Sequence, residues 1–107
     1  MATLVTIKAP NKTKTALVKV SGYVIRLYVG QSQEKLLLQQ TTQGEVVLAH
    51  YASGLNMGSL TPIKLAAARA GRNLTDREAA IGRIDQLISR LGVDKVRETM
   101  ATADVIN

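Results

Sequence analysis

The residues that could carry out chemistry are few in this sequence, and they form no recognisable catalytic set. His50 is the single histidine and there is no cysteine, so a zinc site would need carboxylates, and none lies near His50 in the sequence. A Ser-His-Asp arrangement would have to join His50 to residues of distant segments, the candidates being Ser21, Ser53, Ser59, Asp76 and Asp85. None of these serines stands in a sequence that resembles a strand-to-helix nucleophile elbow. We therefore predict no catalytic residue, no metal site and no cofactor, and interpret the chain as non-enzymatic.

The segment Ser53–Thr61 is the loop with the most functional character. It contains two glycines, it precedes a predicted helix start, and Lys64 follows closely. Free amides at the start of a helix bind anions. The segment lacks the Gly-Lys-Ser/Thr ending of a nucleotide-binding loop, and the chain has no GxGxxG. An anion site, or a small-ligand or enzyme site built here, is therefore one hypothesis, and a simple strand-to-helix connection is the other.

Basic residues and tyrosines alternate along the first half of the chain. The net charge is +6, from 14 basic and eight acidic residues. Two runs carry basic residues without acidic ones: the first contains Lys8, Lys12, Lys14, Lys19 and Arg26, and the second contains Lys64, Arg69 and Arg72. Such charge attracts anionic partners, and it also keeps proteins soluble. We predict a surface for nucleic acid or another anionic partner that consists of Lys19, Arg26, Tyr28, Lys64, Arg69 and Arg72.

The strand phase limits how the tyrosines can take part in such a surface. Single-stranded nucleic acid stacks its bases on aromatic side chains of a sheet. Tyr28 and Arg26 fall on one face of the predicted strand, whereas Tyr23 falls on the other. The three tyrosines Tyr23, Tyr28 and Tyr51 therefore form no predicted three-ring platform, and each can equally cover the edge of the core.

Two further binding modes remain open. The segment 64–71, with Ala67 and Gly71, is similar in spacing to a helix-turn-helix, but the connection to the next predicted helix is long for that motif; two helices packed on a sheet are the alternative. The strand Glu45–Tyr51 is apolar on both phases, which predicts a self-association strand formed by Val46, Val47 and Leu48. A homodimer or a protein interaction module is thus the alternative to anion binding.

The elements that position these residues are strands in the first half of the chain. Alternating residues predict an edge strand over Thr3–Lys8, and Thr15–Val29 changes apolar phase at Ser21-Gly22, which we interpret as a bend or bulge between two strands. Gly30–Glu34 has turn composition. Further strands are expected over Lys35–Thr41 and Glu45–Tyr51, joined by a hairpin loop at Thr42-Gln43-Gly44.

The second half of the chain is helical in pattern. Thr61-Pro62 is typical of a helix start, predicting a helix from Pro62 to Ala70 that Gly71 ends. Thr75-Asp76-Arg77-Glu78 is a capping-box sequence, and apolar residues recur at helical spacing as far as Leu91. A last helix is expected from about Asp94 to Ala103. Six of the eight acidic residues fall at or after Asp76, where they serve as caps and solvated faces.

These patterns predict one α+β domain over residues 1–107, with a β-rich segment over residues 1–51, a loop over residues 52–61 and a helical segment over residues 62–104. We expect an antiparallel meander of three to five strands packed against two or three C-terminal helices. The chain has no apolar stretch long enough for a signal peptide or a bilayer span, from which we predict a cytoplasmic protein with no membrane partner. The predicted function is a small basic binding or regulatory module whose partner is nucleic acid or an acidic protein, or a second copy of the chain.

Overall fold

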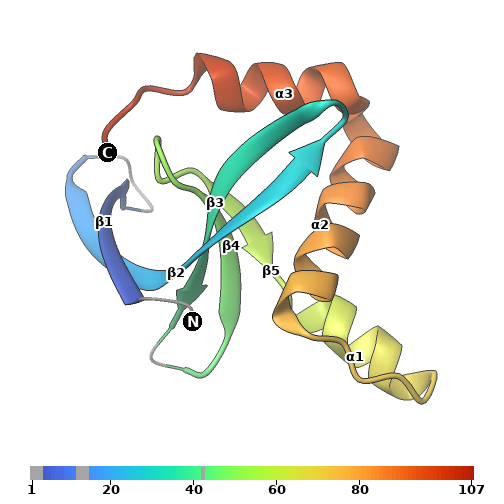
Figure 1. Ribbon diagram of the computed structural model, residues 1–107. Coiled ribbons are helices and arrows are strands. Elements are labelled where there is room, and N and C mark those ends of the chain that lie inside the picture. The colour runs from blue at the N-terminus through green and yellow to red at the C-terminus, as the bar shows by residue number, and fades with distance from the viewer. Residues whose placement is uncertain (1–3, 12–14, 42) are drawn as a thin grey trace.

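The protein is an antiparallel five-stranded meander followed by three helices, which confirms the predicted α+β class (Figure 1). The computed structural model describes residues 4–11, 15–41 and 43–107. Thr3, Lys12, Lys14 and Thr42, which belong to the predicted first strand, basic run and hairpin loop, lie outside the described residues. The strands are β1 (Leu4–Pro10), β2 (Leu17–Val29), β3 (Ser32–Gln40), β4 (Val46–His50) and β5 (Asn56–Ser59), and they neighbour one another in chain order.

Strand β2 is one continuous strand that bends, so the predicted division into two strands at Ser21-Gly22 is wrong, and its pairing with β1 contains no bulge. Its pairing with β1 runs without a shift from Leu4 opposite Tyr23 to Pro10 opposite Leu17. The change of apolar phase arises because the two halves of the strand bury opposite faces. Val20 packs against a second cluster formed by Ile7, Leu37 and Ala49, whereas Ile25, Leu27 and Val29 face the helices. Figure 1 shows β2 as a long, strongly bent strand whose first half curls away with β1.

Gly22 is the residue that allows this close crossing of strands. A Cβ at this position would lie 2.1 Å from the carbonyl oxygen of Leu38 on β3. Only a residue without a side chain therefore fits where β2 passes from one cluster to the other.

Strands β2 and β3 are joined by a tighter turn than the composition of Gly30–Glu34 indicates. Only Gly30 and Gln31 lie between them, with Gly30 at a φ of 63°. Two-residue hairpin turns require positive φ, which glycine adopts without steric cost. The strand therefore starts at Ser32, three residues earlier than expected, and this fixes the register in which Arg26 faces Lys35.

Strand β5 is absent from the sequence prediction, and its presence corrects the predicted self-association strand. Val46, Val47 and Leu48 belong to β4, which pairs with β3 on one side and with β5 on the other. Val47 and Leu48 are buried. These residues offer no free strand edge, because β5 pairs with β4 along that edge. The composition of β5 by itself indicates a connecting loop.

The helices α1 (Thr61–Arg69), α2 (Asp76–Leu91) and α3 (Val93–Thr102) lie on one side of the sheet (Figure 1). The capping box of α2 forms as predicted: Glu78 N–H donates to Thr75 Oγ at 3.1 Å, and Thr75 N–H donates to Glu78 Oε1 at 3.0 Å. The start of α1 differs from the prediction, since Leu60 occupies the cap position and the Thr61 N–H is bound by Ser59 Oγ.

The main core lies between the helices and the sheet. Its buried members come from β2, β3, β4, β5, α2 and α3 and from Leu60 at the cap of α1, and Leu36, Leu48, Leu60 and Ile84 are all at most 2% exposed. Helix α1 has no buried residue and joins the others through Ile63 at the margin of this cluster. On the opposite face of the sheet, β1 and the first half of β2 fold over Leu37 and Ala49. The rest of that face is open and carries the candidate site.

Candidate nucleic-acid interface

The open face of the sheet carries a row of three side chains across three strands. Arg26 on β2 lies directly opposite Lys35 on β3. Tyr51, which follows β4, donates its backbone N–H to the carbonyl of Lys35 at 3.2 Å. Lys35 Nζ lies 3.9 Å from the centre of the Tyr51 ring, a cation–π contact. Because neighbouring strands are about 4.8 Å apart, the row places two cations and one ring side by side.

Each side of this row has a different character. Toward β1 lies an apolar row in which Val24, Leu37 and Ala49 face one another, beneath Ile7. On the other side, Tyr28 lies opposite Gln33, about 7 Å further along β2. The Tyr28 side chain is 66% exposed. An exposed ring of this kind has a free face on which a planar group can stack.

No acidic partner within the described residues neutralises the charges of Arg26 and Lys35. Among residues 4–11, 15–41 and 43–107, the ion pairs are Lys64 with Asp76 and, at 4.0 Å, His50 with Glu34. Glu34 is adjacent to Lys35 in sequence, but it pairs with the inward-facing Leu27 and is directed to the helix side. Because successive side chains of β3 point to opposite faces of the sheet, this carboxylate lies on the other face from the two cations. Two like charges directly opposite one another destabilise a strand pair, so a bound anion would relieve their repulsion.

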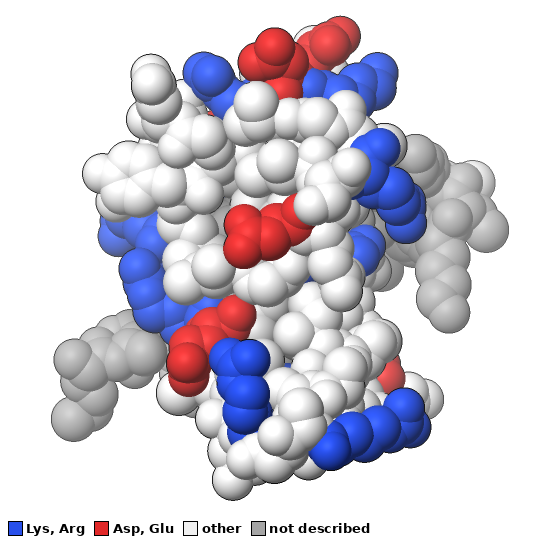
Figure 2. Space-filling view, turned by 90° about the vertical axis from the view of Figure 1, so that its right-hand side faces the viewer, with Lys and Arg blue, Asp and Glu red and all other residues white. Residues whose placement is uncertain are grey.

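The six residues predicted as an anionic-partner surface do not form one patch. Arg26 and Tyr28 share the open face, whereas Lys19 lies on the other phase of β2, opposite Lys8. Arg69 ends α1, and Arg72 lies beyond it. Hydrogen bonds with Thr75 lower the pKa of the Glu78 carboxyl, and Arg72 is close enough to lower it further. Figure 1 shows α1 and the start of β2 at opposite sides of the molecule. On the helical side, Figure 2 shows lysines and arginines in separate places with acidic residues among them.

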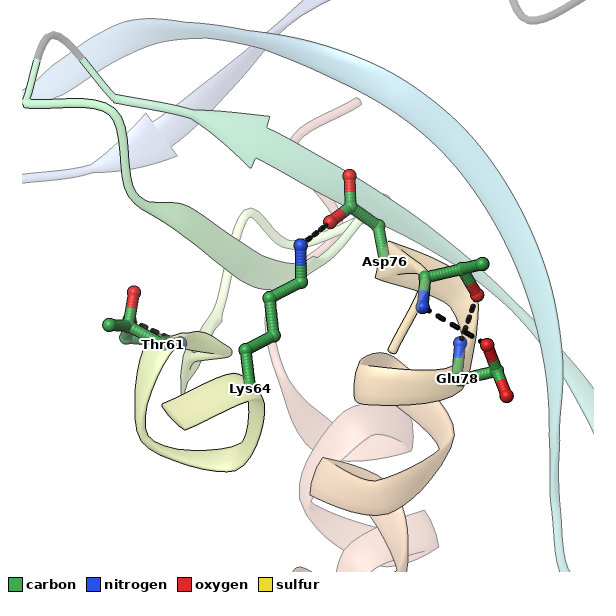
Figure 3. Close-up of polar contacts among 6 residues, drawn as sticks. Thr61, Lys64, Asp76 and Glu78 are labelled. Atoms are coloured by element: carbon green, nitrogen blue, oxygen red, sulfur yellow. Dashed lines mark hydrogen bonds and ion pairs between the residues drawn. The ribbon is translucent and has the colours of Figure 1, made fainter. Parts of the chain in front are cut away.

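Lys64 is already bound within the protein. Its ammonium group pairs with Asp76 at the start of α2, a contact that ties α1 to α2 (Figure 3). The amides of the preceding loop are also bound, since Gly58 N–H donates to Asn56 Oδ1 at 2.7 Å and Thr61 N–H to Ser59 Oγ at 3.2 Å. The predicted anion site at Ser53–Thr61 with Lys64 is therefore not formed by these groups.

His50 and Ser53 lie in contact, but in an arrangement that serves the fold. His50 Nδ1 and Ser53 Oγ are 2.8 Å apart, and the Leu55 N–H donates to the same Oγ at 3.2 Å. Ser53 is only 3% exposed, which leaves its hydroxyl no access to a substrate. The acid that lies beside His50 is Glu34, and not Asp76 or Asp85, the two candidates considered from the sequence. Burial lowers the pKa of His50, and the Glu34 carboxylate partly raises it again.

The helix pair 61–91 departs from a helix-turn-helix. Residues 70–75 connect α1 to α2, whereas that motif uses a turn of about three to four residues. Arg83, one of the arginines on α2, points back to the sheet and donates to the Met57 carbonyl at 2.8 Å. It is therefore not directed outward as a reading residue would be.

Lys35 and Tyr51 are the two members of the open-face row that the sequence patterns do not bring to this surface. Those patterns place each on a strand or at a strand end without a partner. A two-residue turn at Gly30-Gln31 pairs residues 26 and 35, so the hairpin signal could have identified Lys35. Tyr51 required the register of a third strand, which the predicted hairpin loop at Thr42-Gln43-Gly44 does not fix by itself.

The chain has no match among profiles of protein families, curated proteins or solved structures. Within the described ranges, no helix has the length and apolar character needed to cross a membrane. Over those same residues, no three acidic, histidine or cysteine side chains gather as a metal-binding group would. A function is therefore inferred from the open face and its side chains.

Proposed function

We propose that this protein is a small non-enzymatic module that binds single-stranded nucleic acid on the open face of its sheet. The observation that carries the proposal is the row of Arg26, Lys35 and Tyr51 with the exposed ring of Tyr28 beside it. Proteins that bind single strands combine a positively charged track for the backbone with aromatic rings on which bases stack. Both components lie together here on one face of adjacent strands.

The roles of the side chains follow from their chemistry. The planar guanidinium of Arg26 suits a phosphate bound through two parallel hydrogen bonds. Lys35 rests on the Tyr51 ring, which orients its ammonium group for a second phosphate while its other N–H groups remain available. Tyr28 offers its face to a base. Bases in a duplex are already stacked on one another, so this surface favours a single strand over a double strand.

The test is a titration of the protein into labelled single- and double-stranded DNA and RNA, followed by fluorescence anisotropy at about 50 and 200 mM salt. Each phosphate contact with a single strand contributes a slope of about −0.7 in log K against log salt, so two contacts predict about a sevenfold loss of affinity over this range. Single strands should bind more tightly than the matching duplexes.

Variants locate the binding to the open face. We expect Arg26→Gln with Lys35→Gln to lose at least roughly tenfold in affinity and most of the salt dependence. Tyr28→Ala should lose about 1–3 kcal/mol of binding free energy, whereas Tyr28→Phe should retain binding. The matched control is Arg69→Gln with Arg72→Gln, which removes the same charge from the end of α1.

Equal affinities for the two double variants would contradict the proposed face, because the net charge alone would then explain the binding. Absence of binding to any nucleic acid at low salt would reject the proposal and redirect the search to an acidic protein.

A further inference from the structure

A pocket lies on the helical side of the molecule, remote from the open face in the fold. It is bounded by the segment Leu55–Gly58, by the second half of α2 and by α3, which meets α2 at Gly92. Its volume is about 330 Å³, at the lower end of the range for small-ligand sites. The pocket includes residues of the Ser53–Thr61 segment, where an anion site is predicted, but it uses none of the amides expected to form that site.

The lining of the pocket is mainly apolar, with the polar residues Asn56 and Thr99 and a single charged group. Its buried floor consists of Met57, Val96 and Met100, each at most 6% exposed, while Leu91 at the rim is 47% exposed. Arg83 is the only charged residue among those lining the pocket. A ligand that fits must therefore be largely apolar and carry one negative charge.

Arg83 is held in a fixed orientation. Its Nε–H donates to the Met57 carbonyl at 2.8 Å, and Nη1 donates to Gln86 Oε1 at 3.3 Å. The guanidinium lies against Gly58, where an added Cβ would be 2.7 Å from Nε and 2.8 Å from Nη2. Arg83 forms no ion pair in the described portion of the chain, so the positive charge at the pocket wall is uncompensated.

We infer that this pocket binds a small aliphatic monocarboxylate. The carboxylate accepts hydrogen bonds from the N–H groups of Arg83 that are not engaged by Met57 and Gln86, and the tail lies over Leu87, Val96 and Met100. A volume of about 330 Å³ holds roughly ten water-sized groups, which corresponds to a carboxylate with a tail of about eight carbons. The tail would cover the exposed side chain of Leu91.

The experiment measures binding of hexanoate, octanoate and decanoate to the full chain by calorimetry, with methyl NMR of Leu87, Val96 and Met100 to locate the tail. Each added methylene buried in the pocket should tighten binding about fourfold until the pocket is full. Octanol and octylamine are the matched probes without the negative charge, and both should bind at least roughly tenfold more weakly than octanoate.

Two variants test the site itself. Arg83→Gln should abolish the preference for octanoate over octanol. Since this variant also loses the bond to Met57, Thr99→Phe provides a second test that fills the pocket and leaves Arg83 in place; it should abolish binding without unfolding the protein. Arg90→Gln, on α2 but outside the lining, is the control that removes one charge.

Equal binding of octanoate and octanol, or unchanged binding in Thr99→Phe, would overturn the inference. Its outcome is independent of the nucleic-acid proposal, because Arg26→Gln with Lys35→Gln should leave octanoate binding unchanged.

Discussion

At the scale of single residues, His50 is a buried polar group whose hydrogen bonds the fold has to satisfy. It is 8% exposed, with Nδ1 next to the Ser53 hydroxyl and Nε2 4.0 Å from the Glu34 carboxylate. Its neutral form fits this environment better than its charged form, because burial lowers the pKa of His50 more than Glu34 raises it. The single histidine, a candidate for catalysis by residue type alone, therefore links stability to pH.

We expect the free energy of unfolding to fall as the pH is lowered from about 7 through about 6.5, the pKa of an unperturbed histidine. In this range the unfolded chain takes up a proton on His50 that the folded chain does not, so protonation favours unfolding. Urea denaturation between about pH 5.5 and 8 measures the slope. His50→Gln should reduce it, and Glu34→Gln should extend the loss to lower pH, because the folded-state pKa falls further. A slope unchanged in His50→Gln would contradict the assignment.

At the scale of elements, two helix starts of the second half each have a threonine at the expected cap position, but their structures differ. Thr75 and Glu78 form both bonds of the capping box at α2. Thr61 precedes Pro62 at the start of α1, yet its side chain makes no capping bond and Leu60 takes the cap position. The tight return from β5 places the chain in a helical conformation one residue before the threonine.

This difference predicts unequal costs for two matched substitutions. Thr75→Ala should destabilise the protein by about 0.5–2 kcal/mol, because the N–H of Glu78 loses its partner at the start of the long helix. Thr61→Ala should lower the free energy of unfolding by only about a few tenths of a kcal/mol, since the Thr61 side chain caps no amide. Chemical denaturation of both variants at neutral pH provides the comparison. Equal losses would show that Thr61 caps α1 in solution.

At the scale of the whole molecule, the two edges of the sheet are partly occupied by side chains. On β5, Arg83 binds the Met57 carbonyl and Asn56 binds the Gly58 amide. On β1, the Asn107 side chain accepts from the Lys8 N–H and donates to the Lys8 carbonyl, both at 2.7 Å. Figure 1 shows the C-terminal end beside β1. Edges occupied in this way resist pairing with another chain, which weakens the homodimer alternative.

Removal of the contact at β1 should therefore be visible locally. In Asn107→Ala we expect faster hydrogen exchange at the Lys8 amide, because that amide loses its acceptor and becomes accessible to water. Asp104→Ala, in the same tail but without this contact, is the control. Light scattering after size exclusion should give the mass of a monomer for the unsubstituted chain. The mass of a dimer would support the alternative in which two copies pair through their strand edges.

The sequence by itself determined the elements whose signals are local. The α+β class, the capping box at Thr75, the end of α1 at Gly71 and the placement of Arg26 and Tyr28 on one face all depend on neighbouring residues, whose spacing is visible in the chain. Gly71 indeed adopts a φ of 78° beyond α1.

Only the tertiary structure decided which surfaces those elements share. The apolar phase changes along β2 because its two halves bury opposite faces. The free edge of β4 is paired with β5, a strand whose composition is typical of a loop. Lys64 forms an ion pair with Asp76 of another helix and is not available to a ligand. Lys35 and Tyr51 lie beside Arg26 because the register of the strands places them there. These pairings join segments that are distant in the sequence, and they depend on how the strands and helices pack against one another. The pattern of residue types along the chain does not specify which elements pack together.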